Sequence, residues 1–220
     1  MKIISGPLSM FGAKVEIAAH EKGIDFELVM APFDQLRGYA PKHPDVLRVN
    51  PKHQVPVLID GNLEIFDSTQ IFEYLEDLKP NPALWPVHPE ARAMARQLEH
   101  CSDEIYFPHI VRLMGLEDAP DDPAAQTARN EALQYYRRME RVLANREFLA
   151  ETYSYADIAF YMAQLFGARK GAPITRETPN LLAWRERMTA RPAVRKVAGA
   201  MAGYLASIGS AIPDFLQGLN

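Results

Sequence analysis

The part of the chain that decides the fold reads Gln54-Val55-Pro56-Val57-Leu58-Ile59, then Asp60-Gly61-Asn62, then Leu63-Glu64-Ile65-Phe66. Two apolar runs separated by a short turn signal that contains glycine are typical of a β-hairpin. Asp67-Ser68 follows the second run, and apolar side chains then recur at helical spacing as far as Leu78. We therefore predict a hairpin followed by a helix that ends at Leu78, with Ser68 as the N-cap residue.

The start of this helix is a candidate binding site. The first N–H groups of a helix have no partner within the helix and lie at the positive end of its dipole, so they favour an anionic group. Together with the turn before the hairpin, this helix start could hold a small peptide at its middle and at its carboxylate end.

Upstream of the hairpin the pattern predicts a strand, a helix and a second strand. Lys2–Ser5 is a short apolar run, and the helix expected over about Met10–Lys22 ends before Gly23, a typical C′ glycine. Phe26–Met30 is the second expected strand, and the proline-rich residues 32–51 are expected to form an irregular loop with room for one short helix. The resulting order, β-α-β then β-β-α, is the thioredoxin-like arrangement.

After the hairpin and its helix the strands stop. We predict an α/β domain over residues 1–80, a proline-rich linker over 81–88 and an all-helical domain over 89–220. The segment from Ile158 to Phe166 is apolar on nearly all sides, which predicts a helix in the centre of a bundle. Four further sets of apolar residues recur at helical spacing: Met94, Leu98, Cys101 and Ile105; Ala132, Tyr136, Met139 and Leu143; Leu181, Trp184 and Met188; Val194, Val197, Met201 and Leu205.

Composition narrows the class of protein. The 220 residues carry a net charge of −4 and a pI near 5.9, which gives no electrostatic footprint for nucleic acid or an anionic membrane. The single cysteine, Cys101, excludes an internal disulfide framework and fits a reducing compartment. No apolar run reaches membrane-spanning length, and the apolar segment at the start, Met1–Ser5, is too short for a signal peptide. We expect a soluble cytoplasmic protein.

Three motifs, in this order and spacing, resemble those of the soluble glutathione S-transferase family. Asn50-Pro51-Lys52-His53-Gln54-Val55-Pro56 matches the family's Asn-Pro-x-Gly-x-Val-Pro turn, with His53 in place of the usual glycine. Asp67-Ser68 matches Glu/Asp-Ser at the start of a helix, and Ser154-Tyr155-Ala156-Asp157-Ile158 matches Ser-x-Ala-Asp-Ile in the C-terminal half. The resemblance covers nearly the whole chain.

The resemblance implies a thioredoxin-like glutathione-binding domain followed by an all-α domain that contributes a pocket for the electrophile. It also implies a homodimer, glutathione as co-substrate without a metal, and transfer of the thiol to a small hydrophobic electrophile. Two alternatives share this architecture: a glutathione- or ligand-binding protein without turnover, and a glutathione-dependent disulfide-bond reductase or peroxidase.

The resemblance to a serine-type bacterial member of the family implies that Ser9 is the catalytic residue. In serine-type branches the residue that acts on the thiol lies six positions before an apolar residue of the first helix, and Ser9 lies six positions before Val15. A free thiol has a pKa of about 8.5, so little thiolate exists at neutral pH. A hydroxyl that donates to sulfur at a helix N-terminus favours the anion. Ser9 is alternatively only the N-cap of that helix, and the two roles are compatible. Ser5 is a weaker rival because it should lie inside the strand.

The resemblance assigns the glutathione-binding residues around the hairpin. A cis peptide bond before Pro56 would turn the Val55 N–H and C=O outward, where they can pair with the peptide backbone of glutathione. Ser68 is expected to bind the γ-glutamyl carboxylate and Asp67 to face the ammonium of that group. The turn before the hairpin adds His53 and Gln54. Charges for the glycyl carboxylate could come from Arg37 and His43, which are alternatively solvated loop residues.

The electrophile pocket is expected at six residues, which also have an ordinary explanation as core and surface positions: Met10, Phe11, Tyr106, His109, Arg112 and Leu113. Ser154 and Asp157 have the spacing of a capping box, and we assign them a structural role only. No His, Cys or carboxylate cluster has the spacing of a metal site, and no glycine-rich phosphate loop is present.

Overall fold

The computed structural model describes residues 1–35 and 37–219 and contains two compact units. The first unit comprises Met1–Ala83, Pro192–Ser210 and the residues from Gly218. The second comprises Leu84–Arg191 and Ala211–Gln217. Helix α9, Pro192–Ser207, therefore groups with the N-terminal residues, whereas the sequence pattern alone placed it in the helical domain. Its apolar face packs against α1, Met10–Glu21.

The first unit contains a mixed four-stranded sheet of order β2-β1-β3-β4. β1 pairs in parallel with β2 and antiparallel with β3, and β3 and β4 form the predicted hairpin. The thioredoxin-like fold class is confirmed. The bounds of the strands and of the remaining helices of the unit are β1 Lys2–Ser5, β2 Glu27–Met30, α2 Pro44–Val49, β3 Val57–Asp60, β4 Leu63–Phe66 and α3 Ser68–Leu78.

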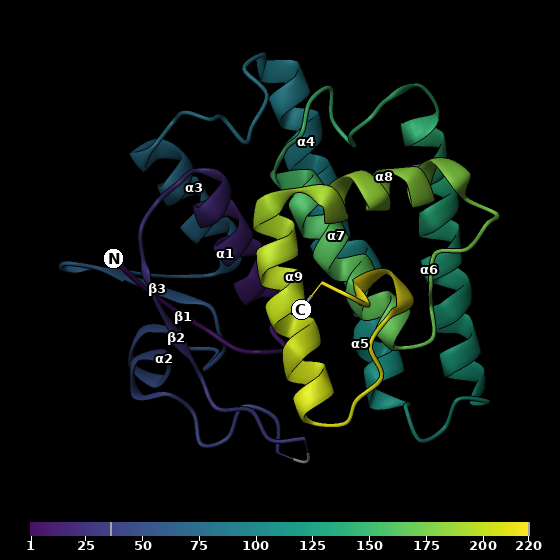
Figure 1. The fold of residues 1–220 in the computed structure, drawn as a ribbon, viewed down its shortest axis with the longest axis horizontal. Coiled ribbons are helices and arrows are strands. Elements are labelled where there is room, and N and C mark those ends of the chain that lie inside the picture. The colour runs from purple at the N-terminus through teal and green to yellow at the C-terminus, as the bar shows by residue number, and fades with distance from the viewer. Residues whose placement is uncertain (36, 220) are drawn as a thin grey trace. The chain divides into compact units, whose positions relative to one another are not determined.

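Helices cover both faces of this sheet. Adjacent residues of β1 point to opposite faces, so each contacts a different set of helices. Ile3 packs in a cluster with residues of α1 and α3, including Val15 and Ile71. Ile4 packs on the other face with Val46 of α2. Figure 1 shows α1 and α3 on one side of the strands and α2 on the other.

The N-cap of helix α3 lies one residue earlier than predicted. Asp67, not Ser68, is the N-cap: its Oδ1 accepts hydrogen bonds from Thr69 N at 3.0 Å and Gln70 N at 3.2 Å. The prediction of Ser68 as N-cap was therefore wrong. Ser68 is the first helical residue and is buried. As the first residue of the helix, Ser68 has its N–H at the positive end of the helix dipole.

The second unit is helical, and α7 is buried along most of its length, as predicted from its apolar sequence. The capping box at its start is present, with Ser154 as N-cap and Asp157 at N3. No helix within the described residues is long and apolar enough to cross a membrane. The bounds in this unit are α4 Pro89–Cys101, the π-helical turn η1 Ser102–Tyr106, α5 Phe107–Gly115, α6 Pro123–Val142, η2 Leu143–Asn145, α7 Tyr155–Arg169, α8 Pro179–Ala190 and η3 Asp214–Leu216.

The apolar face predicted from Met94, Leu98, Cys101 and Ile105 is only partly buried in the structure. Met94 is 55% exposed and Ile105 is 48% exposed, while Leu98 and Cys101 are buried as expected. Ala95 takes the inward position in place of its neighbour. The π-helical turn after α4 holds one more residue per turn than an α-helix, which moves Ile105 out of the buried face.

Candidate functional site

Three chain segments with predicted roles meet at one end of the sheet. In the strand register Ile4 lies beside Val57, and Val57 lies beside Phe66. The end of β1, the start of β3 and the end of β4 are therefore neighbours. The residues that extend these strands are the loop leading to Ser9, the Val55-Pro56 pair and the start of α3.

Ser9 is the N-cap residue of α1, as the more conservative interpretation of the sequence predicted. Its Oγ accepts a hydrogen bond from Gly12 N at 3.0 Å, and its side chain is mostly buried. An accepting hydroxyl keeps its proton available for donation. The side chain can therefore cap the helix and donate to an anion at the same time. Its catalytic role stays a prediction.

Ser5, the rival candidate, is fully buried and lies 2.5 Å from the Glu16 carboxyl, with its Oγ donating to Oε1. Burial raises the pKa of Glu16 from 4.5 to about 7, and the hydrogen bond from Ser5 offsets part of this rise. A Cβ at Gly12 would lie 2.1 Å from the Ser5 Oγ and 3.2 Å from the Ser9 Oγ. The absence of a side chain at Gly12 thus leaves space for both serine hydroxyls at the start of α1.

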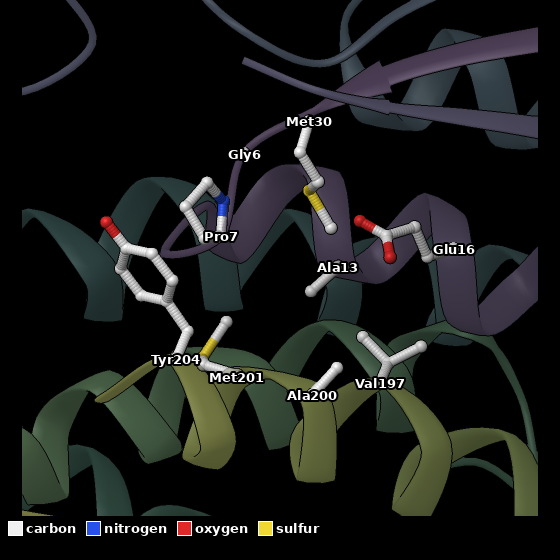
Figure 2. Close-up of a pocket in the computed structure, with 9 residues that line it drawn as sticks. All are labelled: Gly6, Pro7, Ala13, Glu16, Met30, Val197, Ala200, Met201 and Tyr204. Atoms are coloured by element: carbon white, nitrogen blue, oxygen red, sulfur yellow. The ribbon is translucent and has the colours of Figure 1, made fainter. Parts of the chain in front are cut away.

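Glu16 also forms part of the wall of a cavity of about 200 Å³ within the first unit. Figure 2 shows Glu16 and Ala13 of α1 facing Val197, Ala200 and Met201 of α9 across this space. The lining is mainly apolar, and Glu16 supplies its one carboxyl group. The complete lining is Gly6, Pro7, Ala13, Glu16, Met30, Val197, Ala200, Met201 and Tyr204.

The stability of the protein should depend on the protonation of Glu16. Because the folded-state pKa lies above the unfolded value, folding takes up a proton between about pH 4.5 and 7, so the contribution is present below this window and is lost as the pH rises through it. Glu16→Gln should remove about 2 kcal/mol of this pH dependence between pH 5 and 7. Urea unfolding at a series of pH values measures it. Glu27→Gln, at an exposed position of β2, is the control, and equal pH slopes in both variants would contradict the prediction.

The turn before β3 is held by a buried asparagine. Asn50 donates from Nδ2 to the Gln54 carbonyl at 2.7 Å and accepts from Lys52 N at 2.9 Å. The Val55-Pro56 peptide bond is cis, as predicted. Within the described residues, the Val55 backbone N–H and C=O take part in no hydrogen bond. Both groups are therefore available to an extended peptide.

Two residues of this site have a backbone conformation that favours glycine. The φ angle is +54° at His53 and +75° at Asp67. A left-handed conformation explains why the family pattern has glycine at the position of His53. Non-glycine residues held in this region cluster at binding and active sites, because the surrounding structure must stabilise them.

The remaining predicted residues have these positions. His43 caps α2, since its Nδ1 accepts from Asp45 N at 3.2 Å. The exposed Arg37 has its Nε 4.0 Å from Asp34 Oδ1. Gln54 is exposed. Within residues 1–35 and 37–219 no group of three or more His, Cys, Asp or Glu side chains is placed to hold a metal ion.

The six residues predicted for the electrophile pocket belong to both units. Met10 is buried and Phe11 half-buried in the first unit. In the second, Tyr106 is fully buried and its hydroxyl lies 2.5 Å from the Tyr136 hydroxyl. Three others are Leu113, which is buried, His109, which is half-buried, and Arg112, which is exposed. Their common role stays a prediction.

Sequence reasoning missed three residues that position the site. Asn50 was quoted only as part of a motif, and the burial of Glu16 was not foreseen. The hydroxyl of Tyr39 accepts from Leu8 N at 3.1 Å, and the tyrosine ring packs so closely on Gly6 that a Cβ there would lie 2.2 Å from it. The glycine was the available signal, since a backbone that must be approached closely requires it.

Comparison with known proteins agrees with this geometry. Residues 8–78 match the glutathione S-transferase N-terminal domain family, and residues 102–192 match the glutathione S-transferase C-terminal domain family. Glutathione S-transferase 3 of Zea mays is 30% identical over 213 residues, which is 91% of this chain and 94% of the relative. A stringent starvation protein A homolog of Coxiella burnetii is 35% identical over 116 residues, which is about half of each chain (52% and 51%).

Several solved structures are similar to this chain over most of their length. Glutathione transferase F7 from Populus trichocarpa superposes with a TM-score of 0.77 at 25% identity, covering 91% of this chain and 98% of that one. A glutathione S-transferase from Methylobacillus flagellatus, solved with glutathione bound, has a TM-score of 0.78 at 25% identity and covers 89% and 98%. Two matching domain families and a full-length relative show that this chain belongs to the glutathione S-transferase family.

Proposed function

We propose that the protein is a serine-type glutathione transferase that binds reduced glutathione, stabilises its thiolate and transfers it to a small hydrophobic electrophile. The observation that carries this proposal is the position of Ser9. Its hydroxyl caps α1 through its oxygen and keeps its proton for donation, at the positive end of the helix dipole.

Ser9 lowers the pKa of the bound thiol by donating a hydrogen bond to the sulfur anion. The hydroxyl stays protonated throughout and stabilises negative charge that water would otherwise solvate. The thiol proton leaves to solvent, the sulfur forms a bond to the electrophilic carbon, and the displaced group departs with the bonding electrons, as halide does from an aryl halide. In an addition reaction the acceptor takes up a proton instead.

The edge formed by β3 and α3 supplies the binding groups. The N–H and C=O of Val55, which have no hydrogen-bond partner within the described residues, pair with the peptide backbone of glutathione. Ser68 binds the γ-glutamyl carboxylate at the start of α3, while Asp67 faces the ammonium. Gln54 and His53 line the turn beside them.

On the acceptor side, Met10 and Phe11 follow Ser9 directly and are proposed to contact the hydrophobic electrophile. The other residues proposed for this pocket come from α5 and the turn before it: Tyr106, His109, Arg112 and Leu113. The enzyme is proposed to act as a homodimer in the cytoplasm.

Calorimetric titration of reduced glutathione into the folded protein tests the proposal. We expect saturable binding with one site per chain. Asp67→Ala should weaken it roughly tenfold, because the ammonium of the ligand loses a charge-assisted hydrogen bond. Asp122→Ala is the matched control, since Asp122 is also an N-cap aspartate whose capping hydrogen bond is exposed, at the start of α6. Absence of saturation in the wild-type protein would refute the proposal.

A second candidate is a glutathione- or ligand-binding protein without turnover. The similarity to stringent starvation protein A homologues and the presence of His53 where glycine is usual favour it. It predicts the same calorimetric result but no conjugation of aryl halides. Kinetic assays therefore separate the two functions.

A further inference from the structure

The second unit contains a cavity of about 330 Å³ that shares no lining residue with the cavity beside Glu16. It lies where the end of α7, the middle of α8 and the C-terminal segment meet, all within the same unit. Its volume is at the lower end of the range that binds small organic molecules. The lining residues are Ala168, Arg169, Pro173, Ile174, Arg185, Ala211, Ile212, Pro213, Asp214 and Phe215.

Arg185 is the unusual residue of this cavity. Its guanidinium lies over the ring of Phe215, 4.3 Å from the ring centroid. Its Nε is enclosed and has no acceptor among the described residues, and no ion pair of this side chain is found within them. A half-buried guanidinium stays charged, and a buried donor without an acceptor costs about 1–3 kcal/mol. The arginine thus carries binding capacity that the protein does not use.

The wall carries two further charged side chains, Arg169 and Asp214. Arg169 contributes a second guanidinium, which lies over Phe166 at 4.9 Å from the centroid. The one carboxylate, Asp214, accepts a hydrogen bond from Gln217 Nε2 at 3.1 Å. The lining thus includes two guanidinium groups and one carboxylate, and the carboxylate of Glu186, next to Arg185 in α8, also attracts the Arg185 charge. The other lining residues are aliphatic or aromatic.

We propose that this cavity is a binding site for a small organic carboxylate with an aromatic or aliphatic body. The fork of N–H donors on Arg185 matches a carboxylate, which accepts two parallel hydrogen bonds. The side chains of Ile174, Ile212 and Phe215 supply an apolar wall for the body of the ligand. An inorganic anion would leave this apolar surface in contact with water, so the lining favours an organic acid.

Benzoate is a suitable probe because it combines a negative charge with an aromatic ring. Benzamide and inorganic phosphate test these two features separately. Benzamide keeps the ring but lacks the charge, and phosphate keeps negative charge but lacks the ring. In calorimetric titration, benzoate should bind saturably and at least about tenfold more tightly than either comparator. Equal binding of benzoate and benzamide, or no saturation by benzoate, would overturn the proposal.

Arg185→Met removes the charge and keeps most of the side-chain volume, and it should weaken benzoate binding at least about tenfold. Arg185→Lys keeps the charge without the fork and should give an intermediate affinity. Arg137→Met, at an exposed position of α6 that does not line the cavity, is the control. Glutathione titration of the same variants checks that each protein is folded and that the two sites are separate. Unchanged benzoate affinity in Arg185→Met would assign the binding to another place.

Discussion

Replacing Ser9 with alanine should lower kcat for glutathione conjugation about 100-fold and change the KM for glutathione little. A positioned hydrogen-bond donor that stabilises negative charge on a reacting atom raises kcat by a factor of roughly 10²–10³. The loss falls on kcat because the hydroxyl acts on the sulfur, whereas the backbone of Val55 and the start of α3 are proposed to hold the rest of the tripeptide. Steady-state kinetics with an aryl halide, at varied glutathione concentration, measures both constants.

The same substitution also removes a helix cap, which costs about 1 kcal/mol of stability. Ser9→Thr separates the two effects, since threonine keeps both the capping oxygen and a hydroxyl proton. It should retain most of the activity, and thermal unfolding of both variants shows how much protein is folded during the assay. An active Ser9→Ala protein with unchanged kcat would exclude the catalytic role.

Asp157→Ala should destabilise the protein by about 4 kcal/mol. The carboxylate is fully buried and accepts from Leu149 N at 2.8 Å, Trp184 Nε1 at 2.9 Å and Ser154 N at 3.0 Å. Burial raises the pKa of Asp157 to about 6, although these donors offset part of the rise. Alanine leaves several buried donors without an acceptor, at about 1–3 kcal/mol each. We expect the Tm to fall by about 10 °C.

Asp122→Ala is the matched control for this prediction as well. Asp122 caps α6 by accepting from Ala124 N at 2.7 Å, but the side chain is only half-buried and this hydrogen bond is exposed, so water can replace it. Its removal should cost about 1 kcal/mol or less. If the two alanine variants unfolded at similar temperatures, the buried hydrogen bonds of Asp157 would contribute no more than an ordinary cap.

Local patterns predicted the elements that carry the site. The hairpin, the helix after it and the glycine that ends α1 depend on neighbouring residues, so a single sequence suffices for them. The cis bond at Pro56 and the capping box at Asp157 were expected from short motifs. The cap of α3 was misassigned because Asp67 adopts a left-handed backbone, which no periodicity reveals.

Long-range packing explains what could not be predicted. Glu16 looks like any helical glutamate, and only the approach of Ser5 and α9 makes it a buried acid. Arg185 sits among alternating charges that suggest a solvated helix face, and its cavity exists because residues 211–215 return to α7 and α8. Neither environment leaves a trace in the residues next to it in the sequence.

The inclusion of α9 in the first unit has a consequence for biosynthesis. The residues that wall off Glu16 and cover α1 are translated more than a hundred positions after the sheet is complete. The chain leaves the ribosome N-terminus first, so the strands and helices α1 to α3 emerge before α9. Until α9 is made, the surface of α1 that α9 covers is exposed to solvent. Nascent chains that stop short of Pro192 should therefore depend on chaperones more than the finished protein does.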